Sequence, residues 1–125
     1  MNTEHYRTCI DACNACAEAC GHCAKSCLFE PNRMDLSRCI QLDLDCAEIC
    51  RLATDYMARD SELASEICAL CARVCELCAE ECERHPMEHC RQCAAACRLC
   101  AQECSRMLGR VHRGVQVRGA KPATH

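Results

Sequence analysis

The sequence from residue 9 to residue 27 reads CIDACNACAEACGHCAKSC, with its six cysteines separated by alternating steps of four and three residues. Steps of this kind follow the helical turn of about 3.6 residues, so all six cysteines fall on one face of a helix. At about 100° per residue, they occupy a stripe about 80° wide. Such a stripe is typical of the inward-facing seam of a helix bundle, filled here by cysteine where leucine is usual.

The same spacing returns along the rest of the chain. The last two clusters repeat the steps of three and four residues, and the second cluster is thinner. The positions are Cys9, Cys13, Cys16, Cys20, Cys23 and Cys27; Cys39, Cys46 and Cys50; Cys68, Cys71, Cys75, Cys78 and Cys82; Cys90, Cys93, Cys97, Cys100 and Cys104. The repetition indicates four helices that each present a sulfur-bearing face.

Helix-breaking and capping residues separate the clusters. Pro31 interrupts after the first cluster, Asp60 or Ser61 can cap a third helix, Pro86 suits the first turn of a fourth, and Gly109 is a plausible stop. We therefore predict four helices at about 4–28, 35–58, 61–84 and 86–108. Short connections force neighbouring helices to be antiparallel. The predicted fold is all-α, an antiparallel up-down-up-down four-helix bundle with a cysteine-lined core.

The bundle is expected to occupy residues 1–109, followed by a basic C-terminal tail. Residues 110–125 contain Arg110, Arg113, Arg118 and Lys121 and no acidic residue. We expect this tail to form no part of the bundle core. It is either frayed or lies on the bundle surface.

Composition excludes several function classes. The chain has 125 residues, 19 cysteines, no tryptophan and only three aromatic residues, so a core built on large aromatics is ruled out. A net charge of −3 argues against nucleic-acid binding, and the lack of an 18-residue apolar run argues against a membrane span. The segment 1–7 does not resemble a secretory signal, so we expect a cytoplasmic protein with reduced thiols.

Metal binding explains the cysteines better than packing or disulfides do. Leucine would fill a seam better than cysteine, so packing alone does not account for the choice. Cysteines three or four apart on a helix have Cβ atoms about 5–6 Å apart, whereas a disulfide needs about 3.8 Å. An odd number of cysteines also argues against a closed disulfide framework. Two thiolates at this spacing point at one atom between them, and soft thiolates select Cu(I), zinc and iron–sulfur clusters.

Among these metals the pattern favours Cu(I), which accepts two or three thiolates and can therefore fill a sulfur-lined lumen with many ions. Structural zinc needs four ligands, which pairs of helices can supply, so a zinc or general metal buffer stays an alternative. The ferredoxin run C-x2-C-x2-C-x3-C-P is absent from the sequence. An iron–sulfur or thiol redox protein is the weaker alternative.

The repeated C-x2-C and C-x3-C steps over residues 4–108 resemble the bacterial copper storage proteins. The resemblance implies a four-helix bundle that stores multiple Cu(I) ions per monomer without catalysis, as a homotetramer. Because the sequence shows no secretory signal, the chain resembles the cytosolic branch of that family. All nineteen cysteines are the candidate metal ligands.

Six further residues are candidate accessory ligands. Asp43 stands where the second stripe would continue with cysteine, with Leu42 as the competing inward residue. His85 lies three residues past Cys82, at one end of the predicted bundle. The resemblance implies copper uptake at the opposite end, where the first helix begins. The donors expected there are His5, Met57, Met107 and His112.

Overall fold

The computed structural model describes residues 4–117, with side chains described for residues 4–108. It contains the 3₁₀ turn η1 (Glu4–Tyr6), helix α1 (Arg7–Leu28), the 3₁₀ turn η2 (Arg33–Leu36), and helices α2 (Ser37–Ala58), α3 (Ala64–Cys82) and α4 (Glu88–Val117). No β-strand occurs within this described part of the chain. The predicted fold class is confirmed.

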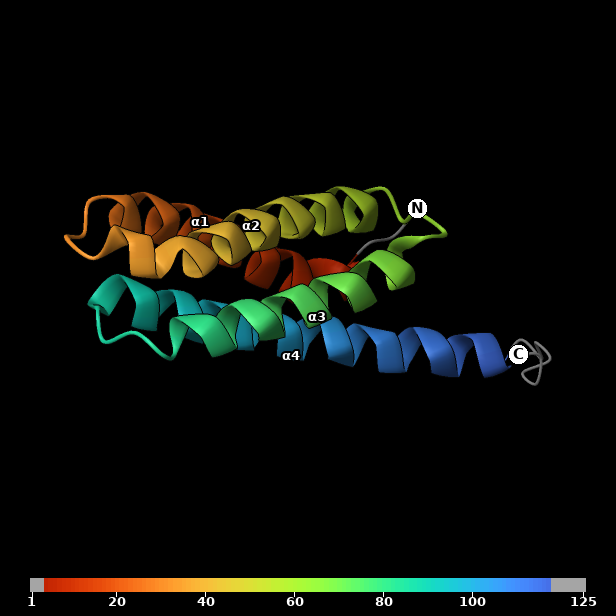
Figure 1. Cartoon of the computed structure of the whole chain (residues 1–125). Coiled ribbons are helices and arrows are strands. Elements are labelled where there is room, and N and C mark those ends of the chain that lie inside the picture. Colours follow the sequence, from red (N-terminus) through yellow and green to blue (C-terminus); the bar gives the residue numbers. More distant parts are fainter. Residues whose placement is uncertain (1–3, 118–125) are drawn as a thin grey trace.

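The four long helices run alternately up and down, and each packs against two neighbours (Figure 1). Helix α1 packs against α2 and α4, and α3 packs against α2 and α4. The α1–α2 and α3–α4 connections meet at one end, which we call the histidine end because His85 and His89 lie there. The other end, which contains Tyr6 and the α2–α3 connection, is called the tyrosine end.

The core consists almost entirely of cysteine and alanine. Every cysteine is at most 1% exposed, so all nineteen side chains point between the helices. Buried alanines such as Ala17, Ala47, Ala79 and Ala101 lie beside them and let the helix backbones approach closely. The larger buried side chains Leu36, Met57 and Met107 lie toward the ends of the helices. Cysteine sulfurs therefore line the interior of the bundle along its long axis.

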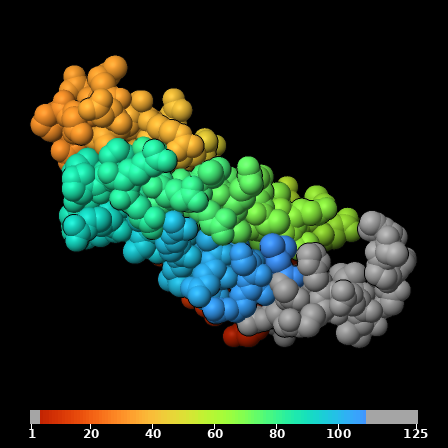
Figure 2. All heavy atoms as spheres, turned by 60° about the horizontal axis from the view of Figure 1, so that its bottom comes forward, coloured from red at the N-terminus to blue at the C-terminus, as the bar shows by residue number. Residues whose placement is uncertain are grey.

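Seen from the side of α3 and α4, the molecule is elongated, with the segment between α1 and α2 at one tip (Figure 2, orange). That segment exposes Phe29 and Met34, and Leu28 at the end of α1 is exposed beside them. None of the described helices is long and apolar enough to cross a membrane.

The helix bounds differ from the predicted ones by two or three residues at the start of each helix and at the end of α3, and by nine residues at the end of α4. Helix α3 begins at Ala64, because residues 59–63 form a turn in which Asp60 takes a positive φ of 51° and Ser61 Oγ accepts a hydrogen bond from the Leu63 amide. Helix α4 begins at Glu88, two residues after Pro86. It then continues to Val117, well beyond the end predicted at residue 108.

Helix α4 is longer than predicted because Gly109 does not end it. Glycine costs about 1 kcal/mol relative to alanine inside a helix, but it ends a helix only when its backbone turns left-handed. A glycine after a cysteine stripe is thus a weak stop signal. Residues 118–125 of the predicted tail lie outside the described residues, and a tail separate from the bundle stays a prediction.

Candidate metal centre

The cysteine sulfurs of all four helices meet along the bundle axis. Cys16 of α1 illustrates this at mid-bundle. Its Sγ lies 3.6 Å from that of Cys46 on α2, 4.0 Å from that of Cys75 on α3 and 3.7 Å from that of Cys97 on α4. The Cys16 thiol thus contacts a cysteine on each of the other three helices.

These contacts continue from one end of the bundle to the other. The Cys9 and Cys104 sulfurs are 3.5 Å apart near the tyrosine end, and the Cys27 and Cys90 sulfurs are 3.9 Å apart near the histidine end. Between them, contacts such as Cys93 to Cys20 at 3.6 Å bridge the helices. Toward the histidine end the sulfurs of Cys39 and Cys82 connect to this series through the carboxyl group of Asp43. The Cys39 sulfur in turn lies within 4.8 Å of those of Cys23, Cys27 and Cys90.

Several sets of four buried cysteines have all their sulfurs within 4.8 Å of one another, and three of the sets share Cys16, Cys46, Cys20 or Cys97 with another set. Examples are Cys13, Cys71, Cys100 and Cys104; Cys16, Cys46, Cys50 and Cys75; Cys16, Cys20, Cys46 and Cys97; Cys20, Cys78, Cys93 and Cys97; and Cys23, Cys27, Cys39 and Cys90. Tetrahedral zinc, with Zn–S distances of about 2.3 Å, places its sulfurs about 3.8 Å apart, so one set alone would also fit zinc. The sharing of sulfurs between sets is the arrangement that bridged Cu(I)–thiolate sites need.

Asp43 lies inside the sulfur lining and not at its edge. Its side chain is fully buried, whereas Leu42 is only partly buried, so Asp43 is the inward residue of the two. The thiols of Cys78 and Cys93 donate to Asp43 Oδ1 at 3.2 and 3.3 Å. Burial first, and then the neighbouring Cys93 and Cys78, raise the pKa of Asp43 from 3.8 to about 10. The carboxyl group therefore carries a proton at neutral pH in the metal-free protein.

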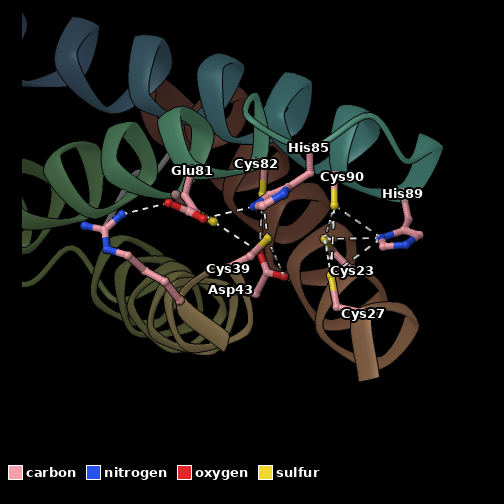
Figure 3. Close-up of polar contacts among 11 residues, drawn as sticks. Cys23, Cys27, Cys39, Asp43, Glu81, Cys82, His85, His89 and Cys90 are labelled. Atoms are coloured by element: carbon pink, nitrogen blue, oxygen red, sulfur yellow. Dashed lines mark hydrogen bonds and ion pairs between the residues drawn. The ribbon is translucent and has the colours of Figure 1, made fainter. Parts of the chain in front are cut away.

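His89 is the second non-sulfur donor that faces the lining. Its Nδ1 lies 3.6 Å from the sulfurs of Cys23 and Cys90 and 3.9 Å from that of Cys27 (Figure 3). The sequence pattern missed this contact, because His89 directly precedes Cys90 and so falls off the three-and-four stripe. Its place in the first turn of α4 is the signal for a ring that lies at the bundle end.

His85 belongs to an ion-pair network at the same end. Its Nε2 is 2.9 Å from Glu81 Oε2, and Arg38 Nη1 donates to Glu81 Oε1 at 3.0 Å (Figure 3). Burial raises the pKa of Glu81, but the hydrogen bonds from His85 and Arg38 outweigh burial and lower it. His85 is therefore held by a carboxylate beside Cys39 and Cys82.

The tyrosine end is closed by apolar side chains. Tyr6 is 5% exposed, Met57 is fully buried and Met107 is 4% exposed. Burial and the adjacent Asp60 raise the pKa of Tyr6. The exposed His5 ring lies 4.2 Å from the Tyr6 ring, measured between centroids. His112 falls in the part of α4 whose side chains lie outside the described residues.

Burial keeps two thiols at the histidine end protonated. Loss of solvent raises the pKa of Cys90 to about 11 and also raises the pKa of Cys27. Metal binding requires thiolates, so each ion that enters this end must displace protons.

Comparison with known proteins decides between the metal chemistries that the geometry allows. The family model of the copper storage proteins matches residues 2–109. The chain belongs to the copper storage protein family. The resemblance inferred from the cysteine spacing is therefore confirmed, and this family accounts for nearly all of the described bundle.

Three similar proteins place the chain within the family. The cysteine-rich Bacillus subtilis protein YhjQ, itself uncharacterized, is 48% identical over 86 residues, which are 69% of this chain and 80% of YhjQ. The structure of the Cu(I)-bound copper storage protein BsCsp3, from Bacillus subtilis, is also 48% identical, with a TM-score of 0.82 over 84% of this chain and 99% of its own. A cytosolic copper storage protein from Streptomyces lividans, with five coppers, is 41% identical, with a TM-score of 0.83 over 86% of this chain and 94% of its own.

Proposed function

We propose that this chain stores multiple Cu(I) ions inside its bundle, bound as bridged thiolate complexes. The observation that carries the proposal is the series of buried sulfur contacts along the bundle axis, from Cys9 and Cys104 near one end to Cys27 and Cys90 near the other, in a member of the copper storage family. Storage keeps reactive Cu(I) away from oxygen and from the metal sites of other proteins, and it leaves the ions available for later supply.

The proposed ligands are all nineteen cysteines, joined by two mixed donors. Asp43 offers a carboxylate oxygen to the sites formed with Cys78, Cys82 and Cys93. His89 offers Nδ1 to the sites formed with Cys23, Cys27 and Cys90. Soft thiolate bridges supply most of the binding free energy, and the harder oxygen and nitrogen donors modulate single sites.

The remaining candidates have other proposed roles. The burial of Met57 and Met107 supports a role in sealing the tyrosine end. The His5 ring contacts the Tyr6 ring at a tilted angle, and His85 is bound to Glu81, so both are proposed to position neighbours instead of holding the stored ions. His112 stays a candidate donor on the sequence alone.

The proposed action is binding and release without catalysis, in the cytosol. Two relatives support this assignment: the Streptomyces protein is a cytosolic copper storage protein, and the Bacillus protein binds Cu(I). Since the apo thiols carry protons, copper uptake releases protons, and a fall in pH favours release of copper.

We also propose that the chain forms a homo-oligomer, a tetramer by likeness to the family, through the face shared by α2 and α3. An open groove of about 420 Å³ lies there, lined by Ile49, Leu52 and Val74 with Asp45 and Glu48 at its rim. Leu70, about half exposed, lies one helical turn before Val74 on α3 and extends this apolar face. A second copy of the chain would cover these side chains, and light scattering on the apo protein tests the oligomeric state.

An anaerobic titration tests the storage proposal. The reduced apo protein is titrated with Cu(I) against a competing chelator, and the titration is repeated with Zn(II). We expect the number of bound Cu(I) ions per chain to approach the number of cysteines, with few and weakly bound zinc ions. Saturation at a handful of Cu(I) together with tight zinc binding in four-thiol sets would overturn storage and identify a zinc protein.

A further inference from the structure

The two ring nitrogens of His89 face chemically different surroundings. Nδ1 points to the sulfurs of Cys23, Cys27 and Cys90, at 3.6 to 3.9 Å. Nε2 lies 2.9 Å from the carboxylate oxygen Oε2 of Glu30, which comes from the segment between α1 and α2. Its side chain is 13% exposed and that of Glu30 is 27% exposed, so the pair lies at the boundary between the core and solvent.

The carboxylate determines which nitrogen carries the ring proton. An ionised carboxylate can only accept hydrogen bonds, so Nε2 must be the donor in this contact. In a neutral imidazole only one nitrogen is protonated, and the lone pair is then left on Nδ1, aimed at the thiols. Without an acceptor at Nε2, the proton is free to move to Nδ1, and the ring could no longer donate that lone pair to a metal ion.

Glu30 is itself fixed to the end of the first cysteine stripe. Its backbone amide donates to the Cys27 carbonyl oxygen at 3.1 Å, in the turn that closes α1. Pro31 follows and restricts the backbone of Glu30 to few conformations. The carboxylate is therefore held in register with Cys27, the cysteine that shares the Nδ1 contact of His89.

We propose that Glu30 is a positioning residue for copper binding, which holds His89 as the Nε2–H tautomer so that Nδ1 presents its lone pair to Cu(I) at the histidine end. This inference rests on the proposed storage of Cu(I). Carboxylates that bind the far nitrogen of a metal-binding histidine change metal affinity by about 10–100-fold when they are removed.

The first test reads the tautomer directly in the reduced apo protein, by the imidazole ¹⁵N shifts of His89. The wild type is expected to be the Nε2–H tautomer. Glu30→Gln keeps an acceptor oxygen and should retain this tautomer, whereas Glu30→Lys offers only donors and should move the proton to Nδ1. Glu30→Ala, which only removes the acceptor, replaces Glu30→Lys if the latter does not fold.

The second test measures copper affinity by chelator competition on the same variants. Glu30→Lys should weaken binding of the ions held at the histidine end about ten-fold, with the total number of bound ions unchanged, and Glu30→Gln should bind as the wild type does. Glu88→Lys is the matched control, because it makes the same charge change next to His89, at an exposed carboxylate that is bonded by Gln92 instead.

The outcomes separate this inference from the storage proposal. The inference is overturned if His89 keeps the Nε2–H tautomer in Glu30→Lys, or if that variant loses no more affinity than Glu88→Lys. A wild-type chain that binds only a handful of Cu(I) ions would overturn storage, while the apo tautomer measurement would still decide whether Glu30 orients the ring.

Discussion

Asp43 is an ionisable oxygen donor placed inside a lining of sulfur. A buried charge without a compensating partner is costly, and the side chain avoids that cost by keeping its proton. The thiols of Cys78 and Cys93 surround the carboxyl group in the apo protein. If Asp43 is a copper ligand as proposed, the same group would become an anionic oxygen when a cation enters and displaces the proton. Asp43 would then link copper occupancy to protonation at a single residue.

We predict that Asp43→Asn flattens the pH dependence of apo stability. Burial raises the pKa of Asp43 from 3.8 to about 10, so between these values the unfolded chain loses a proton that the folded chain keeps. The free energy of unfolding therefore falls as pH rises through this window, by up to about 1.4 kcal/mol per pH unit from this group. Asparagine removes the effect, and the variant should gain stability over the wild type as pH rises from 5 to about 8.

Anaerobic denaturant unfolding of both apo proteins at the two pH values checks this prediction. Asp55→Asn is the control, since Asp55 is exposed on the same helix and does not line the groove proposed for a second copy. Equal pH slopes for the wild type and Asp43→Asn would contradict a protonated Asp43.

Residue by residue, the sequence predicted what the helical period governs. The inward position of every cysteine follows from steps of three and four. The same period left Asp43 and Leu42 as alternatives in the second stripe, and the structure places Asp43 inside. The contact of His89 with the thiols does not follow, because it depends on how the first turn of α4 meets the end of α1. That is a tertiary relation, with no periodic signal in the sequence.

At the scale of the helix, the cysteine stripes give little intrinsic stability. Cysteine is a modest helix former, and α1 contains Gly21 in its interior. A Cβ built on Gly21 would meet no atom within 4 Å, so the structure leaves open space for a methyl group. Glycine there brings no packing advantage that alanine would lose.

Gly21→Ala should therefore stabilise the apo protein by about 0.5–1 kcal/mol, because alanine loses less backbone entropy in a helix. The matched control is Ala69→Gly at an exposed position within α3, which should destabilise by a similar amount. Thermal unfolding under reducing conditions measures both changes. A loss of stability in Gly21→Ala would mean that another surface, such as a second copy of the chain, approaches this position.

The ends of α1 and α2 were predicted correctly, at Leu28 and Ala58, whereas the starts of the helices and the end of α4 were not. Pro31 does follow the end of α1. The turn before α3 depends on the positive φ of Asp60. Aspartate tolerates this conformation, but its presence in a sequence does not predict it. The length of α4 beyond Gly109 depends on local backbone energies that differ by about 1 kcal/mol, too little for a single glycine to decide.

On the scale of the molecule, the core buries small side chains instead of large apolar ones. A cysteine and alanine core gains less from the hydrophobic effect than a leucine core of the same length. Bound ions that bridge thiolates of different helices would supply cross-links that the apo bundle lacks. Bound copper would therefore add to the stability of a core that gains little from the hydrophobic effect.

Copper loading is accordingly predicted to raise the thermal midpoint in proportion to the ions bound, since an ion that binds the folded state tighter than the unfolded one stabilises it. Scans of the apo, half-loaded and fully loaded protein check this, and removal of copper by an excess of chelator should restore the apo midpoint. A midpoint that does not change with loading would mean that the ions bind equally well to unfolded chains.

The two ends of the bundle differ in a way that predicts the route of copper uptake. Tyr6, Met57 and Met107 close the tyrosine end, whereas His85 and His89 are 16% and 13% exposed beside the carboxylates of Glu81 and Glu30. Carboxylates attract a cation, and imidazole is a ligand that binds Cu(I) without holding it as tightly as a cysteine thiolate. These features favour uptake at the histidine end, opposite to the end that the family resemblance implied.

Stopped-flow loading from a weak Cu(I) complex distinguishes the two routes. We expect the double variant His85→Leu/His89→Leu to load several-fold more slowly, because the ion loses its first partly exposed ligands. Met57→Leu/Met107→Leu keeps the apolar seal and removes only the thioethers, so it should load at the wild-type rate. If the methionine variant were slow and the histidine variant unchanged, copper would enter where α1 begins. The apolar seal at that end would then have to open during uptake.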